Sequence, residues 1–144
     1  LTYTTSNKAV ATVDAAGKVT VKGLGVAKIT VKAAATTDYK AASKTVTVTV
    51  APKKQSISLV NKIKKQLTIK WKKNTKASGY QVVYSTNKKF TGKKTVRKAK
   101  TTTSYKIKGL KKGKKYYVKV RSYKTVNGKR IYGAYSTAKK ATIK

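Results

Sequence analysis

Alternation of apolar and polar residues, rather than helical spacing, dominates the first third of the chain. Residues 18–22, 28–32 and 44–50 each place Val or Ile at every second position, between Thr or Lys. A period of two puts alternate side chains on opposite faces of a β-strand, which is typical of half-buried strands. Glycines lie in the turns that flank the first of these segments. The pattern predicts about four strands before residue 52.

Pro52 is the only proline of the chain and directly follows the strongest of these strands. Because proline cannot donate a hydrogen bond to a β-ladder, it marks the end of a strand and a domain boundary. We therefore predict two modules, residues 1–51 and residues 52–144.

A second series of short alternating segments follows Pro52. Asn127-Gly128 lies between two of them and predicts a type I′ hairpin turn. Strands are expected around the following residues: 57–59, 67–71, 80–84, 105–110, 116–120 and, at the end of the chain, roughly 135–143. With the hairpin, seven short strands at this spacing indicate an antiparallel β-sandwich. The predicted fold class is all-β, with two immunoglobulin-like sandwich modules in tandem.

Aromatic residues at inward positions of these strands define the expected core of the second module. The core prediction names four residues: Trp71, Tyr80, Leu110 and Tyr116. Other tyrosines, among them Tyr132 and Tyr135, are left with two alternatives, because a tyrosine next to lysine either stacks on sugars or bases or packs on lysine stems. Packing is the commoner outcome.

Residues 53–144 resemble a fibronectin type III domain. The resemblance rests on LTIKW at 67–71, YQVVY at 80–84 and LKKGKKYYVKV at 110–120. It implies that Trp71 is a core residue of the second strand and that the Tyr116 hydroxyl bonds to upstream backbone as a tyrosine corner. An Arg-Gly-Asp motif is absent, so the resemblance does not imply integrin binding by that route.

Residues 1–51 resemble the second half of a bacterial immunoglobulin-like domain of group 2, as found in cell-surface proteins. The matching stretch is SNKAVATVDAAGKVTVKGLGVAKITVKA, residues 6–33. The resemblance implies that the first strands of this domain are missing and that the chain is a fragment of a longer protein. A module of this size buries a poor core. We expect an open strand edge, which a protein partner or a neighbouring chain would complete.

Catalytic and metal-binding chemistry finds little support in the sequence. The chain contains no His and no Cys, so the commonest general bases and nucleophiles are missing. Its two carboxylates are Asp14, expected to bond turn amides, and Asp38, expected in a loop. Two isolated carboxylates do not make a calcium site. We predict no enzyme activity, no catalytic residues, no metal and no cofactor.

The charge is almost entirely of one sign. Lys and Arg number 37 against two acidic residues, and 34 of the 37 are Lys. Such charge suggests an anionic environment, and the excess of Lys favours diffuse attraction over specific recognition. The predicted polyanion-binding residues lie at outward strand positions or next to them: Lys70, Lys72, Lys106, Lys108, Lys119 and Arg121. The Lys70 and Lys106 strands are expected to be neighbours, with like charges opposite each other.

These features predict a non-catalytic structural or adhesion module of a bacterial cell-surface or secreted protein. The expected partners are anionic polymers such as teichoic acid and glycans, bound by charge. An alternative is an accessory module of a secreted glycan hydrolase or peptidase whose catalytic domain lies elsewhere. No motif supports sequence-specific binding of nucleic acid, and no apolar run is long enough to span a membrane.

Overall fold

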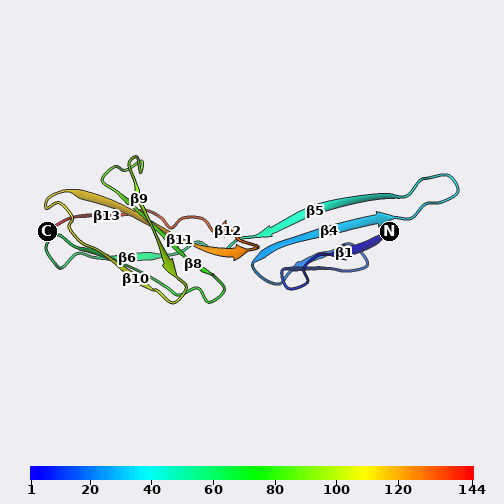
Figure 1. Ribbon diagram of the computed structural model, residues 1–144, viewed down its shortest axis with the longest axis horizontal. Coiled ribbons are helices and arrows are strands. Elements are labelled where there is room, and N and C mark those ends of the chain that lie inside the picture. The colour runs from blue at the N-terminus through cyan, green and yellow to red at the C-terminus, as the bar shows by residue number, and fades with distance from the viewer. The chain divides into compact units, whose positions relative to one another are not determined.

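The computed structural model describes residues 1–144 and consists of β-strands joined by turns and loops. This confirms the all-β prediction (Figure 1). No helix long and apolar enough to cross a bilayer is found. The chain forms two compact units, which are described separately: Leu1–Ala51 with Val126–Lys129, and Pro52–Thr125 with Arg130–Lys144.

The first unit contains five strands in two sheets, one more than the alternation predicts. They are β1 (Thr2–Thr5), β2 (Ala11–Val13), β3 (Val19–Val21), β4 (Gly25–Ala33) and β5 (Ala42–Val50). The order β1-β4-β5 forms one antiparallel sheet and the β2-β3 hairpin forms the other. The sequence underestimates the number because β1 and β2 are too short to show an alternating Val and Ile pattern.

Asp14 holds the turn of the β2-β3 hairpin, as predicted. One carboxylate oxygen, Oδ1, accepts hydrogen bonds from the Ala16 N–H at 3.0 Å and from the Lys18 N–H at 2.8 Å. Gly17 has a φ of 85° in this turn. A side chain there would also meet the ring of Tyr3, so the turn needs glycine for two reasons.

The core of the first unit is small. Val10, Ala11 and Ala27 are buried, and Val48 and Val50 pack against them. By contrast, several alternating valines stay largely in solvent, with exposed fractions of 41% for Val19, 56% for Val21 and 52% for Val46. Among the alternating residues Ile29 is buried, at 5%, and Val31, Val48 and Val50 are half-buried. In the β1-β4-β5 sheet, β1 and β5 each pair only with β4, so both outer edges of this sheet are unpaired.

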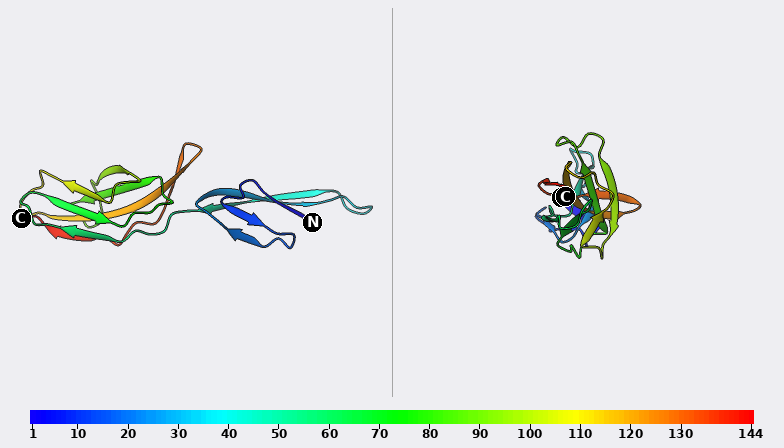
Figure 2. Two further views of the ribbon diagram at one scale, coloured as in Figure 1. Left: turned by 90° about the horizontal axis from the view of Figure 1, so that it is seen from below. Right: turned by 90° about the vertical axis from the view of Figure 1, so that its left-hand side faces the viewer.

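The second unit contains eight strands in two antiparallel sheets, apart from the tip of the β11-β12 hairpin (Val126–Lys129), which is grouped with the first unit (Figures 1 and 2). The three-stranded sheet has the order β10-β7-β6, and the other sheet has the order β12-β11-β8-β9, with β13 also paired to β11. The strands are β6 (Ile57–Val60), β7 (Leu67–Trp71), β8 (Gly79–Ser85), β9 (Lys94–Ala99), β10 (Ser104–Ile107), β11 (Lys115–Val126), β12 (Lys129–Tyr132) and β13 (Lys139–Thr142). Asn127 and Gly128 both have positive φ, 48° and 74°, which fits the predicted type I′ turn.

Two strand predictions for this unit are wrong in part. The sequence misses β9, because its residues KTVRKA are mostly polar and exposed. The last strand was expected from about residue 135 but spans only Lys139–Thr142. In the segment before it, Ser136 pairs with β11 through its side chain: its Oγ accepts the Val120 N–H at 3.0 Å, while its own N–H donates to the Val120 carbonyl at 2.7 Å. A hydroxyl therefore replaces a backbone acceptor, and the regular ladder begins only at Lys139.

The core of the second unit lies between its two sheets. Tyr80 is 0% exposed, and Leu110 and Trp71 are 5% and 6% exposed. The rings of Trp71 and Tyr80 lie 5.4 Å apart. Tyr116 differs from the expectation, since it is only half-buried. Its hydroxyl accepts the N–H of Lys111, five residues upstream, at 3.4 Å.

Candidate polyanion interface

The structure does not bring the six predicted polyanion-binding residues into one patch. Lys70 (β7) and Lys106 (β10) lie on the outer face of the three-stranded sheet, whereas Lys119 and Arg121 lie on the outer face of the other sheet. Because the two sheets pack inner face to inner face, these outer faces point in opposite directions. Lys72 and Lys108 directly follow β7 and β10. These two strands are antiparallel, so Lys72 and Lys108 lie at opposite ends of the pair.

Lys70 and Lys106 are on neighbouring strands, but they do not face each other directly. Ser104 is the partner of Lys70, and Thr68 is the partner of Lys106. On its other side, Lys70 faces Ser58 of β6. The expected opposition of like charges is therefore wrong: the two ammonium groups are on diagonal positions, where repulsion is weaker than between direct partners.

Lys119 and Arg121 belong to an aromatic–cation ladder, which we define as Phe90, Lys119, Tyr135, Arg121 and Tyr132. The Lys119 ammonium lies 4.1 Å from the ring centre of Phe90 and 4.4 Å from that of Tyr135. The Arg121 guanidinium lies 3.8 Å from the ring centre of Tyr132 and 4.3 Å from that of Tyr135. These distances are within the range of cation–π attraction. Both cations are half-buried, so they are less available to a polymer than the lysines of the opposite face.

Gln81 anchors the middle of this ladder. Its Oε1 accepts hydrogen bonds from Arg121 Nε at 2.6 Å and from the Tyr135 hydroxyl at 2.9 Å. Burial raises the pKa of Tyr135 above its ordinary value, although the Arg121 guanidinium lowers it. The hydroxyl therefore stays protonated at neutral pH and remains a donor. Of the two alternatives for Tyr132 and Tyr135, the structure shows packing on cationic side chains.

Replacing Arg121 with Ala should destabilise the second unit by about 2–3 kcal/mol, because two ring contacts and a charged hydrogen bond are lost. The Arg121→Lys variant is the matched control, since it keeps the positive charge and loses the planar guanidinium group. We expect it to be more stable than Arg121→Ala and less stable than the unsubstituted chain. Urea unfolding followed by circular dichroism measures both. Equal stability of Arg121→Ala and the unsubstituted chain would show that the ladder does not stabilise the fold.

A group of eight exposed lysines lies at one end of the second unit, and the sequence prediction includes only Lys108 of this group. We call it the basic end; it comprises Lys62, Lys64 and Lys65 between β6 and β7, Lys108, Lys111, Lys112 and Lys114 between β10 and β11, and Lys144. All eight are exposed. The runs KIKK (62–65) and KKGKK (111–115) are visible in the sequence, but only the tertiary structure places them together.

Backbone hydrogen bonds fix the three segments of the basic end to one another. The Lys65 N–H donates to the Lys144 carbonyl at 2.9 Å, and the Leu110 N–H donates to the Lys65 carbonyl at 3.0 Å. The Gly113 N–H donates to the Ile143 carbonyl at 2.8 Å. The lysine side chains therefore extend from backbone segments that are hydrogen-bonded to one another, rather than from independent loops. A surface of like charges with no acidic neighbour attracts polyanions over several ångströms.

No cluster of three or more His, Cys, Asp or Glu residues that could hold a metal ion is found.

Two family models match the chain. The model described as the intimin immunoglobulin-like domain matches residues 1–36, and the model of the fibronectin type III domain matches residues 50–137. The matches confirm the predicted layout of an immunoglobulin-like segment followed by a fibronectin type III domain. The first match is to the intimin type, whereas the sequence had suggested group 2. No curated protein sequence matches the chain.

Solved structures share the fold at low sequence identity. The FN1–FN3 domains of chicken CNTN1 are 18% identical with a TM-score of 0.57, covering 88% of this chain and 47% of that one. The fn3 domain of human contactin 1 is 16% identical with a TM-score of 0.54, covering 65% and 80%. The sixth fibronectin type III domain of a human protein named for that domain is 16% identical with a TM-score of 0.53, covering 64% and 85%. The chain thus spans about half the length of the chicken structure, and these similarities show the fold alone.

Proposed function

Because the chain belongs to the fibronectin type III family through residues 50–137, we propose that it is a basic spacer of a bacterial cell-surface or secreted multidomain protein. Modules of this family and of the intimin immunoglobulin-like family are typically structural, non-catalytic and extracellular. The proposed mechanism is non-covalent: the sandwich supplies a folded scaffold, and its exposed lysines associate with anionic polymers of a cell wall or host surface.

The observation that supports this proposal is the charge of the second unit. Residues 52–144 contain 30 of the 37 basic residues and neither Asp nor Glu. Almost all of these cations lie on the surface, and eight of them form the basic end. A surface that served solubility alone would carry charges of both signs. A surface of one sign repels itself, and a polyanion that neutralises it lowers that electrostatic cost.

The chemistry of the cations favours an unselective partner. Lysine presents a flexible, strongly hydrated point charge, whereas bidentate recognition of phosphate or carboxylate calls for arginine. Of the three arginines, Arg121 is engaged in the ladder and Arg130 lies 5.6 Å from the ring centre of Tyr123. Teichoic acids and acidic glycans fit as partners because they offer repeated negative charge without a required base sequence.

Charge removal at the basic end tests the proposal. A quadruple variant with Gln in place of Lys62, Lys64, Lys111 and Lys112 should bind heparin more weakly, with the slope of log affinity against log salt reduced by about one for each lost contact. The control removes four exposed lysines from other parts of the same unit: Lys70, Lys93, Lys100 and Lys106. Isothermal titration at several salt concentrations gives both slopes. Unchanged affinity in the basic-end variant would contradict the proposal.

A further inference from the structure

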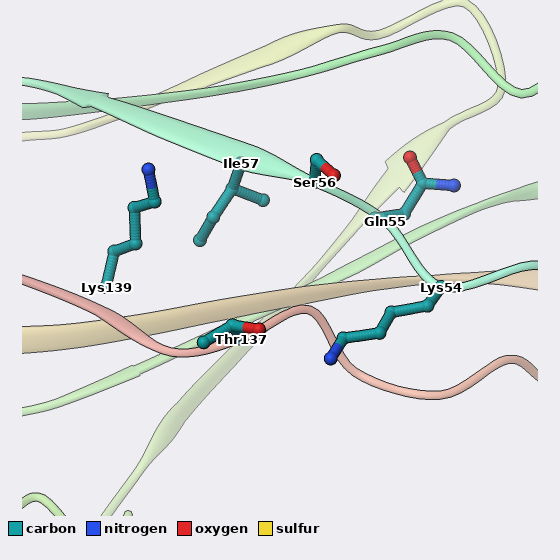
Figure 3. Close-up of a pocket in the computed structure, with 6 residues that line it drawn as sticks. All are labelled: Lys54, Gln55, Ser56, Ile57, Thr137 and Lys139. Atoms are coloured by element: carbon teal, nitrogen blue, oxygen red, sulfur yellow. The ribbon is translucent and has the colours of Figure 1, made fainter.

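A groove of about 450 Å³ lies on the second unit, between the residues that lead into β6 and those that lead into β13. Figure 3 shows its lining: one wall carries Lys54, Gln55, Ser56 and Ile57, and the other carries Thr137 and Lys139. The two walls come from edge strands of different sheets, so the groove runs along the edge of the sandwich, between its two sheets. Its volume is within the range of about 300–1,000 Å³ that is usual for small-ligand sites.

Each wall of the groove contributes one ammonium and one hydroxyl. Lys54 and Ser56 supply them from the β6 side, and Thr137 and Lys139 from the β13 side (Figure 3). All four residues are exposed and therefore accessible to a ligand. A tetrahedral oxyanion accepts hydrogen bonds in several directions, so donors on two facing walls suit it better than lysines on a flat sheet. No acidic residue occurs in residues 52–144 to neutralise these cations.

The β6 wall of the groove is fixed and partly apolar. Ile57 is 6% exposed and belongs to the hydrophobic core of the unit. Gln55 is 8% exposed, and its Nε2 donates to Ser122 Oγ at 3.3 Å, which holds this stretch against β11. Carbon atoms of a sugar or polyol can lie against the apolar part of this wall while the charged group meets the ammonium and hydroxyl groups. The groove therefore suits an ester of a sugar or polyol better than a free ion.

We propose that this groove binds one phosphate or sulfate ester unit of an anionic polymer. The inference rests on the proposed function and deepens it: in addition to the diffuse attraction of the lysine surfaces, one defined site would recognise the ester group. Phosphate and sulfate esters share the tetrahedral oxyanion, and teichoic acid, which is a polyol phosphate polymer, and heparin, which is a sulfated polysaccharide, are the probes that separate them.

Two variants of the full 144-residue chain isolate the groove. The first, Ser56→Ala with Thr137→Val, leaves the net charge unchanged and removes both hydroxyls. We expect it to weaken binding of the preferred polymer about tenfold, with an unchanged salt slope. The second, Lys54→Gln with Lys139→Gln, is compared with Lys70→Gln and Lys106→Gln, which removes the same charge from the open outer sheet face. The groove pair should cost several-fold more affinity than the control pair.

Affinities of all variants for teichoic acid and heparin at one salt concentration decide between the outcomes, with thermal unfolding as the check that each variant folds. A larger loss with teichoic acid assigns the phosphate ester, and a larger loss with heparin assigns the sulfate ester. If both lysine pairs lose the same affinity and the hydroxyl variant loses none, the groove is not a binding site. The proposed function would be unaffected by this result. If the unsubstituted chain binds neither polymer at low salt, the proposed function fails and the groove inference fails with it.

Discussion

Replacing Trp71 with Ala is expected to lower the free energy of unfolding of the second unit by about 3–5 kcal/mol. Trp71 is 6% exposed, lies at the end of β7 and packs 5.4 Å from the ring of Tyr80. Alanine would leave a cavity between the two sheets, and the strands on either side are held by their ladders and cannot close it. Urea unfolding of the full chain, followed by far-UV circular dichroism, measures the change.

The Trp71→Phe variant provides the matched control. The indole Nε1 of Trp71 is buried and has no hydrogen-bond partner. Phenylalanine keeps an aromatic ring in the core and removes this unpaired donor, so part of the lost packing is offset. We expect a loss of about 1 kcal/mol. A Trp71→Ala variant as stable as Trp71→Phe would mean that the ring does not support the sandwich.

The strands of the second unit could be predicted wherever apolar residues alternate with polar ones. Leu67, Ile69 and Trp71 are buried as their phase requires. The prediction fails at β9, which gains its strand conformation by pairing with β8 rather than from apolar residues of its own. It also fails before β13, where the Ser136 side chain replaces part of the ladder. Both failures arise from contacts between residues far apart in the chain.

The candidate site was less predictable than the fold. The alternating pattern predicts that Lys119 and Arg121 lie on the solvent-exposed face of the sheet. It does not show that the rings of Tyr132 and Tyr135, which come later in the chain, pack over these two cations. Val83 is on the same outer face of this sheet, paired with Lys119, and it is 0% exposed because this face is covered by side chains. For the basic end, the sequence shows the two lysine-rich runs but not that they lie together. Its assembly depends on backbone bonds that join residues up to 79 positions apart, such as Lys65 and Lys144.

Binding of the chain to polyanions is expected to depend steeply on salt. Neutralising a polyanion with Lys releases condensed counterions, and six to ten such contacts cost about 10³–10⁵ in affinity between 50 and 200 mM salt. The basic end alone supplies eight exposed lysines for contacts of this kind. Because the attraction is to charge rather than to a particular group, polymers of similar charge density should show similar slopes. The groove inferred above would add a preference among them without removing the slope.

The most direct test of the account is a titration of the 144-residue chain with heparin, double-stranded DNA and teichoic acid at 50 and 200 mM salt. We predict binding to all three at 50 mM and a loss of about 10³-fold or more at 200 mM for DNA, with parallel losses for the other two polymers. A neutral polysaccharide serves as the control and should not bind at either concentration. Affinity that does not change with salt, or a preference for the neutral polysaccharide, would contradict the account.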